Sequence, residues 1–233
     1  MYSCQQSMNP VLKWAGGKKQ LLPLINAMLP NDYCRYYEPF VGGAAVFLSL
    51  APSNAIINDV NIQLINLYLQ IKNSVEEIIY YINFMDNKTC DLDYYLEMRR
   101  KYNKKIQTNT LDAECAALLV WINKHCFNGL YRVNSKGLFN VPYNNKIQGR
   151  SIDEENIRNI SRYLRTKDIS ITCSDFEDTC KTVKANDFVY FDSPYIPQSN
   201  TADFTSYAKT GFTEEDHRRL ASLYKNLMPQ VQN

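Results

Sequence analysis

The stretch CRYYEPFVGGAAVFLSLA at residues 34–51, followed by AIIND at residues 55–59, predicts the fold of this chain. Its first part has the aromatic and apolar residues of a strand, Gly42 and Gly43 form the middle, and AAVFLSLA has the apolar spacing of a helix. The second stretch is a short apolar strand that ends in Asp59. The order strand, turn, helix, strand is typical of a parallel sheet covered by helices.

The rest of the chain divides into a middle segment and a return to the α/β order. Residues 64–85 and 113–127 have helical spacing, whereas NGLYRVNSKGLFNVPYNN at 128–145 is rich in turn residues and predicts hairpins and loops. After the middle segment we expect, in order, a helix, two strands and a last helix, at residues 152–164, 169–175, 187–193 and 213–227.

The composition is that of a globular protein: of 233 residues, 45% are hydrophobic and 21% are charged. The seven cysteines are scattered and include no CxxC pair, so we expect reduced thiols and neither a disulfide framework nor a metal site. No apolar run is long enough to span a bilayer, and the N-terminus does not have the pattern of a signal peptide. We therefore expect a cytoplasmic protein with no membrane partner.

Charge is unevenly distributed although the net charge is only +2. No acidic residue occurs between Glu114 and Asp153, and RRKYNKK lies just upstream at residues 99–105. The acid-free interval contains five cations, interleaved with aromatic residues: Lys124, Arg132, Lys136, Lys146 and Arg150. One such run is usually a solvated surface, but two in the same segment favour a surface that contacts phosphates.

A glycine or an aspartate follows each of the predicted strands: Gly42, Asp59, Asp175 and Asp192. In a parallel α/β sheet the carboxyl ends of the strands border one crevice, so we expect these residues to lie together. A glycine turn with an acid at the end of the next strand suits an adenosine, because the backbone can approach closely and the acid accepts the ribose hydroxyls. A structural alternative is that each Asp simply begins a turn.

The tetrapeptide Asp192-Ser193-Pro194-Tyr195 suits chemistry on the amino group of a base. Such an amine is a poor nucleophile because its lone pair is delocalised into the ring. A carboxylate and a backbone carbonyl that accept its two hydrogens raise its reactivity, and an aromatic ring can stack on a base swung out of the duplex. The alternative for the tetrapeptide alone is a proline turn that closes a strand.

Together these motifs resemble the Dam-type, α-class DNA adenine-N6 methyltransferases, which use S-adenosylmethionine (SAM). The resemblance covers nearly the whole chain and rests on LKWAGGKKQLLPLI, YYEPFVGGAAVF, INDVN, FNGLYRVNSKGLFNVPY and VYFDSPYIPQSNTADFTSYAKTGFTEED. It implies a Rossmann-like SAM-dependent methyltransferase sheet with an inserted, mainly helical DNA-recognition domain. The expected division is a catalytic domain of residues 1–62 plus 158–233 and a target-recognition domain of residues 63–157.

The resemblance also implies site residues. Those that bind the cofactor are Trp14, Lys18, Phe40, Gly42, Asp59, Asp175, Phe176 and Asp192, and the catalytic group is Asp192, Ser193, Pro194 and Tyr195. In this assignment Asp59 holds the ribose, and Asp175 and Phe176 flank the cofactor adenine. Asp192 accepts from the target amine, and Tyr195 stacks on the flipped adenine. The structural alternatives are Trp14 as core, Lys18 as a solvated charge and Asp175 as a helix cap.

By the same resemblance the partner is double-stranded DNA, contacted by Lys13, Phe127, Asn128, Leu130, Arg132, Asn134 and Pro142. Arg132 is expected to recognise a guanine because its planar fork matches O6 and N7 in the major groove. We expect the site GATC or a close variant, and no metal. The alternative for Phe127 and Leu130 is the core of a hairpin. Such enzymes, bacterial or phage-encoded, serve restriction–modification or regulatory methylation.

Three features depart from the family pattern. Ser193 replaces a proline, and Ala44 stands where the family's turn has a glycine, which is a penalty if that position has positive φ. The family continues beyond the helix that precedes Asn233, so the chain is expected to be truncated. Two other functions stay open: a SAM- and DNA-binding remnant without turnover, and a methyltransferase acting on a protein side-chain amide.

Overall fold

The computed structural model describes residues 8–30, 32–146, 149–194 and 212–228. Within them a parallel sheet has the order β3-β2-β1-β4. Its strands are β1 (Tyr36–Glu38), β2 (Asn54–Asn58), β3 (Asp168–Thr172) and β4 (Phe188–Val189). This confirms the α/β, Rossmann-like fold class expected from the sequence.

Both faces of the sheet are covered, because neighbouring side chains of β1 point in opposite directions. Tyr36, fully buried, packs on Phe47 of α2 (Ala45–Leu50) with ring centroids 6.5 Å apart. The Tyr37 hydroxyl instead donates to the Thr182 carbonyl oxygen at 3.1 Å, in the loop after α8 (Phe176–Cys180). Helices therefore bury the aromatic strand on two sides.

Helix α2 begins at a strained position. Ala44 precedes it with φ of 59° and ψ of 27°, in the left-handed region, and its side chain is fully buried. The glycine that the family has here would adopt this conformation freely, whereas a Cβ costs roughly 1–2 kcal/mol. The sequence departure at Ala44 therefore coincides with a real backbone requirement.

The middle segment forms a helical body around α6 (Ala113–His125), which is buried on every side. The predicted helical run at residues 64–85 is two helices, α3 (Ile62–Asn73) and α4 (Val75–Asp86), which separate at Ser74 with φ of −140°. Helix α5 (Leu92–Gln107) completes the body by packing on α6.

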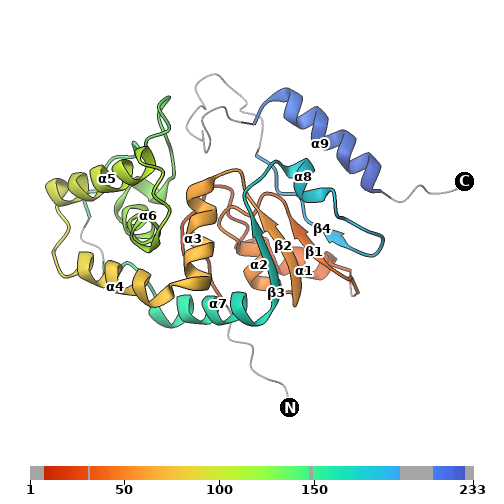
Figure 1. The fold of residues 1–233 in the computed structure, drawn as a ribbon, viewed down its shortest axis with the longest axis horizontal. Helices are drawn as coiled ribbons and strands as arrows, with labels where there is room; N and C mark the ends of the chain where they lie inside the picture. Colours follow the sequence, from red (N-terminus) through yellow and green to blue (C-terminus); the bar gives the residue numbers. More distant parts are fainter. Residues whose placement is uncertain (1–7, 31, 147–148, 195–211, 229–233) are drawn as a thin grey trace, which may run out of the picture.

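Helix α3 joins the helical body to the sheet. Figure 1 shows α4, α5 and α6 to one side, with α3 between them and the strands. Helix α3 packs on α6 and also on α7 (Glu154–Thr166) and β3, and α7 itself packs on β3. The predicted boundary at residue 157 falls inside α7, and the division into domains stays a prediction.

The remaining helices lie around the sheet edges. Helix α1 (Leu22–Met28) packs on α2, and α8 and α9 (Glu214–Leu227) lie on the side away from the helical body (Figure 1). In the part of the chain that the structure describes, no helix is both long enough and apolar enough to cross a membrane.

Candidate active site

The candidate site lies at the carboxyl edge of the sheet, at the point where the order of the strands reverses. From β1 the chain moves to β2 and β3 on one side, whereas β4 pairs with β1 on the other side. In doubly wound sheets this reversal between neighbouring strands is where ligands bind. The polar residues that follow these strands lie at this edge, as the sequence predicts.

The turn after β1 is closed by the acid after β2. Gly42 has φ of +47° and donates its N–H to Oδ2 of Asp59 at 3.1 Å, while the Asn61 N–H donates to Oδ1 at 2.9 Å. The Tyr68 hydroxyl donates to the Gly42 carbonyl oxygen at 2.7 Å. Burial raises the pKa of Asp59 to about 6, against the lowering effect of these backbone donors.

The N-terminal segment, residues 12–18, covers this turn. A Cβ added to Gly42 would lie 3.0 Å from the Trp14 ring, and one added to Gly43 would lie 3.0 Å from Trp14 Cβ, so the glycines permit a close contact. Trp14 is half-buried and also stacks on Tyr131, with ring centroids 5.1 Å apart. Trp14 thus packs on the core, as the structural alternative had it, and at the same time forms a wall of the site.

Lys18 and Asp192 form an ion pair across the edge. Lys18 Nζ lies 2.6 Å from Asp192 Oδ1 and donates to the Gly16 carbonyl oxygen at 2.7 Å, and the two charged side chains are only 13% and 24% exposed. Lys18 is therefore not a solvated surface charge. The pair brings the N-terminal segment to the residue that follows β4.

Glu38, at the end of β1, belongs to the same cluster and was missed in the sequence analysis. It is buried and accepts a 2.6 Å hydrogen bond from the Tyr36 hydroxyl. Burial raises the pKa of Glu38 to about 8; the Tyr36 bond opposes the rise, nearby Asp192 adds to it, and Lys18 opposes it. An acid at the end of an aromatic strand, in YYEPF, was the available signal.

A second group of residues lies around the start of α8. Asp175 caps this helix by accepting from the Glu177 N–H at 2.9 Å, so its alternative as a helix cap is correct, and it stands beside Phe176 at the same edge. The Phe176 ring lies 5.4 Å from Phe40, and the Phe212 ring contacts both, at 5.6 and 5.9 Å. Phe212 was missed because no local pattern marks it.

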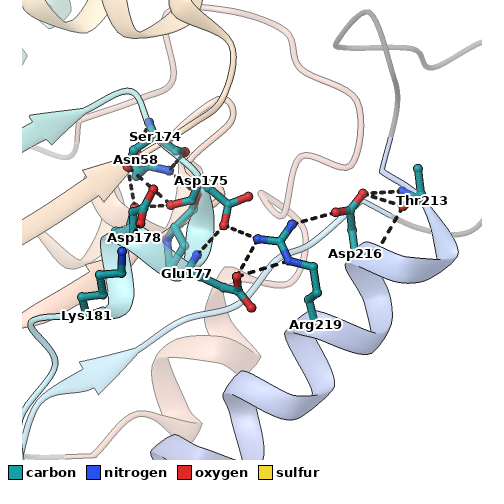
Figure 2. A network of polar contacts seen from close by, with 11 residues as sticks. Asn58, Ser174, Asp175, Glu177, Asp178, Lys181, Thr213, Asp216 and Arg219 are labelled. Atoms are coloured by element: carbon teal, nitrogen blue, oxygen red, sulfur yellow. Dashed lines mark hydrogen bonds and ion pairs between the residues drawn. The ribbon is translucent and has the colours of Figure 1, made fainter.

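Figure 2 shows the polar network on this side. Asn58, at the end of β2, accepts hydrogen bonds from the backbone and the side chain of Ser174, at 2.9 and 3.0 Å. This holds the turn between β3 and α8 against β2. Arg219, from α9, reaches Asp175 at 2.7 Å and was also missed in the sequence analysis.

The predicted catalytic tetrapeptide is only partly described. Asp192, Ser193 and Pro194 come after β4, separated from it by two residues, and the Tyr190 N–H donates to the Tyr37 carbonyl oxygen at 2.8 Å, which continues the strand register toward them. Tyr195 lies outside the described residues.

The predicted DNA-contacting residues, Lys13 apart, lie in residues 127–142, called here the recognition segment. Two antiparallel bridges, Cys126 with Tyr143 and Val133 with Phe139, give it the expected hairpin form. Phe127 is 51% exposed, which contradicts its alternative as hairpin core.

The other predicted contacts differ in their exposure. Asn128 and Pro142 are exposed, and the Phe127 N–H donates to the Pro142 carbonyl oxygen at 2.8 Å. Leu130 is half-buried and packs against the core, in agreement with its structural alternative. Lys13 is exposed, and its aliphatic stem lies against Gly129.

Arg132 is held by one side of its guanidinium group. Its Nε donates to Asn140 Oδ1 at 2.8 Å, and the two terminal nitrogens have no hydrogen-bond partner among the described residues. Asn134 accepts from the N–H groups of Lys136 and Leu138 and so closes the turn at the hairpin tip. Asn134 is thus a turn residue in this structure. Arg132 presents its two terminal guanidinium nitrogens without a partner among the described residues.

Neither a second hollow nor a metal-binding group among the described residues competes as a site. A hollow of about 520 Å³ lies at the opposite, amino-terminal edge of the sheet, lined by Asp32, Tyr33, Cys34, Ser53, Asn54 and Asn186. It holds none of the predicted site residues. Across the described ranges, no group of three or more His, Cys, Asp or Glu residues is placed to hold a metal ion.

Comparison with known proteins adds an independent finding. The family model for the D12 class N6 adenine-specific DNA methyltransferase matches residues 14–232. The type II methyltransferase M1.LlaDCHI of Lactococcus lactis subsp. cremoris is 43% identical over 95% of this chain and 78% of its own length. M.MjaIII of Methanocaldococcus jannaschii is 39% identical over 94% and 80%, and the DNA adenine methylase of Escherichia coli K12 is 33% identical over 93% and 76%.

Proposed function

Because this chain belongs to the D12 class of N6 adenine-specific DNA methyltransferases, we propose that it transfers a methyl group from SAM to a flipped adenine in GATC or a close variant. The observation that carries this proposal is the meeting of two pairs at one edge of the sheet. The Gly42–Asp59 turn suits a nucleoside, and the Lys18–Asp192 pair suits the reacting amine.

The residues at the edge fit the parts of SAM, which when bound supplies an electrophilic methyl group. Asp59 has a carboxylate to accept the ribose hydroxyls, and its bond to the Gly42 N–H fixes the turn beside it. Asp175 and Phe176 would flank the adenine ring. The half-buried Phe40 offers it an apolar face, and the buried Phe176 ring packs against Phe40. Glu38 is buried beside Asp192 and Lys18, where it can ionise in response to a cationic ligand.

Asp192 would act on the target amine. In this structure its Oδ1 is held by Lys18, which fixes the orientation of the carboxylate. Hydrogen bonds from the adenine N6 amino group to this carboxylate and to the Ser193 carbonyl oxygen would withdraw the amine from conjugation with the ring. The nitrogen lone pair would then be free for in-line attack on the methyl carbon. The N–CH₃ bond would form as the S–CH₃ bond breaks, with S-adenosylhomocysteine as the leaving group and the surplus N6 proton released to solvent. No covalent enzyme intermediate is needed.

The recognition segment would supply sequence selectivity. The exposed Phe127 ring is available to enter the base stack, and Arg132 has its two terminal nitrogens free for O6 and N7 of a guanine. Both lie in the segment between Glu114 and Asp153, which lacks acids and contains five cations that favour contact with phosphates. We propose residues 63–157 as the recognition domain, with α7 as its link to the sheet.

Transfer of labelled methyl from SAM to a GATC duplex, compared with a scrambled duplex, tests the proposal. Product is expected on GATC alone, and Asp192→Ala is expected to lower transfer by about 100-fold or more. Arg132→Ala is expected to lose about 1–3 kcal/mol of discrimination at one base pair. Arg150→Ala is the matched control, because Arg150 lies in the same acid-free segment, is 81% exposed, and pairs only loosely with Glu154 at 3.7 Å.

Three outcomes would contradict the proposal. Unchanged discrimination in Arg132→Ala would remove the assignment of Arg132. Normal SAM affinity with no transfer to any duplex would identify a binding remnant without turnover. Failure of duplex DNA to bind at low salt would favour action on a protein amide.

A further inference from the structure

Arg219 joins α9 to the start of α8 through several carboxylates. Its Nη2 lies 2.7 Å from Asp175 Oδ1 and 2.6 Å from Glu177 Oε2, and its Nη1 lies 2.9 Å from Asp216 Oδ1 (Figure 2). The guanidinium carbon also stands 4.8 Å from the centre of the Phe176 ring. One side chain therefore contacts both of the residues proposed to flank the cofactor adenine, Asp175 and Phe176.

The hydrogen bonds to Asp175 are all made to one oxygen. Oδ1 accepts from the Glu177 N–H at 2.9 Å and from Arg219 at 2.7 Å. Oδ2 has no hydrogen-bond partner among the described residues, and in Figure 2 the dashed lines from Arg219 and Glu177 both end on the other oxygen. With Oδ1 held by two donors, the carboxylate cannot rotate freely, and Oδ2 is presented as an acceptor.

The neighbouring arginine shows that this arrangement is specific. Arg218 is 70% exposed, and its ion-pair partners among the described residues are Glu214 and Glu215 of its own helix. Arg219 is half as exposed, at 33%, and reaches 44 residues back in sequence. Phe212, just before α9, also contacts the Phe40 and Phe176 rings. The charged contacts of Arg219 and the aromatic contacts of Phe212 therefore meet at Asp175, Phe176 and Phe40.

We propose that Arg219 is a positioning residue that makes the cofactor site selective for adenine over a ring that has a carbonyl at the same position. It holds Asp175 Oδ1 so that Oδ2 accepts a hydrogen bond from the exocyclic amino group, and it braces Phe176 from behind by a cation–π contact. The inference rests on the proposed function, in which Asp175 and Phe176 flank the adenine of SAM.

Binding of two product analogues, measured by calorimetry, tests the inference without turnover. S-adenosylhomocysteine has the amino group, whereas S-inosylhomocysteine has a carbonyl in its place and stacks equally well. The wild type should prefer the adenosyl compound by about 10- to 150-fold, the effect of one hydrogen bond to a charged group. Arg219→Gln should bring this ratio close to one by weakening the adenosyl compound alone.

Two further variants make the test sharper. Arg218→Gln removes the same charge from the same helix and should leave both affinities unchanged. Asp175→Asn should favour the inosyl compound, because Arg219 and the Glu177 N–H require the amide oxygen at the Oδ1 position and so turn the NH₂ group toward the ligand. Arg219→Gln in the Asp175→Asn background should abolish that reversed preference.

The opposing results are distinct. An equal loss of affinity for both compounds in Arg219→Gln would show that Arg219 is merely structural and would overturn the inference, as would an unchanged ratio. If Arg219→Gln does not fold, Arg219→Lys, which keeps the charge but lacks the fork, is expected to lower the ratio, and an unaltered ratio there would overturn the inference. Failure of the wild type to bind either compound would refute the proposed function itself.

Discussion

Two elements are attached to the sheet edge in opposite ways. The recognition segment is joined to the N-terminal segment by a buried, neutral side chain, Asn123, whereas α9 is joined by the half-exposed, charged Arg219. Hydrogen bonds of a buried side-chain amide are unaffected by salt and costly to lose. Partly exposed ion pairs are weakened by salt and contribute little to stability. The difference indicates that one attachment is permanent and the other adjustable.

The neutral attachment is complete. Asn123 Oδ1 accepts from the Lys13 N–H at 2.9 Å, and its Nδ2 donates to the carbonyl oxygens of Lys13 at 3.0 Å and Gly129 at 2.9 Å. Every hydrogen of the amide is therefore used. Beside it, Trp14 of the N-terminal segment stacks on Tyr131 of the recognition segment, so the two segments are also in direct contact here.

The charged attachment is sparse by comparison. No residue of α9 is fully buried, and its contacts with the rest of the described chain come mainly through Arg219 and the preceding Phe212. The helix itself is well formed, since Thr213 and Asp216 make a capping box. Helix α9 is thus locally stable but loosely attached.

The largest expected effect comes from breaking the neutral attachment with Asn123→Asp. A carboxylate cannot donate to the Lys13 and Gly129 carbonyl oxygens, so two buried acceptors lose their partner and a charge is buried. We expect the free energy of unfolding in urea to fall by about 2–4 kcal/mol.

Asn103→Asp is the matched control for this change. Asn103 makes the same two-way pair with the Phe139 backbone, at 2.8 and 3.0 Å, but is half-buried and does not touch the N-terminal segment. We expect the free energy of unfolding to fall by less in Asn103→Asp than in Asn123→Asp. Equal losses in the two variants would show that Asn123 has no special place in the attachment.

Gly129→Ala tests the same attachment by crowding it. A Cβ at Gly129 would lie 2.6 Å from Lys13 Cδ and 2.7 Å from Lys13 Cβ, and φ is +65°. The backbone strain alone costs roughly 1–2 kcal/mol, and displacement of Lys13 adds to it. The free energy of unfolding in urea should fall by more in Gly129→Ala than in Gly16→Ala, where φ is +77° but the atom nearest to the added Cβ is 3.9 Å away. A loss no greater than in Gly16→Ala would mean that the close approach carries no energy.

The smallest effect is expected when the charged attachment is weakened by salt. Raising NaCl from 0.05 to 1 M should weaken the attachment of α9 by at most about 1 kcal/mol. Hydrogen exchange should accelerate in peptides of residues 214–227 and stay constant in those of residues 113–131. Acceleration in both would remove the distinction between the attachments.

Acid should act on α9 in the same direction. The pKa of Asp216 lies below its ordinary value of 3.8, because hydrogen bonds from the Thr213 backbone and side chain, and from Arg219, favour the carboxylate. The contribution of the ionised Asp216 to the stability of α9 is complete above pH 3.8 and is lost as the pH falls through the lowered pKa. The neutral Asn123 attachment has no such dependence.

By itself the sequence determined the features that depend on neighbours along the chain. The apolar spacing of residues 34–51 and 55–59 predicted strand, turn, helix and strand, and the acids that end the strands predicted Asp59, Asp175 and Asp192 at one edge. The resemblance in long motifs predicted the family, which the comparisons confirm. Such patterns are readable because helix and strand periods are set locally.

Only the tertiary structure decided which distant groups meet. Asn123 meets Lys13 across 110 residues, Arg219 meets Asp175 across 44, and Glu38 acquires its raised pKa from burial beside Asp192. An asparagine in a helix, an arginine in a charged run and an acid after a strand are common local patterns that name no partner. Their roles arise because the chain path removes them from water, and a buried polar group must then find its partner in whatever the fold places beside it.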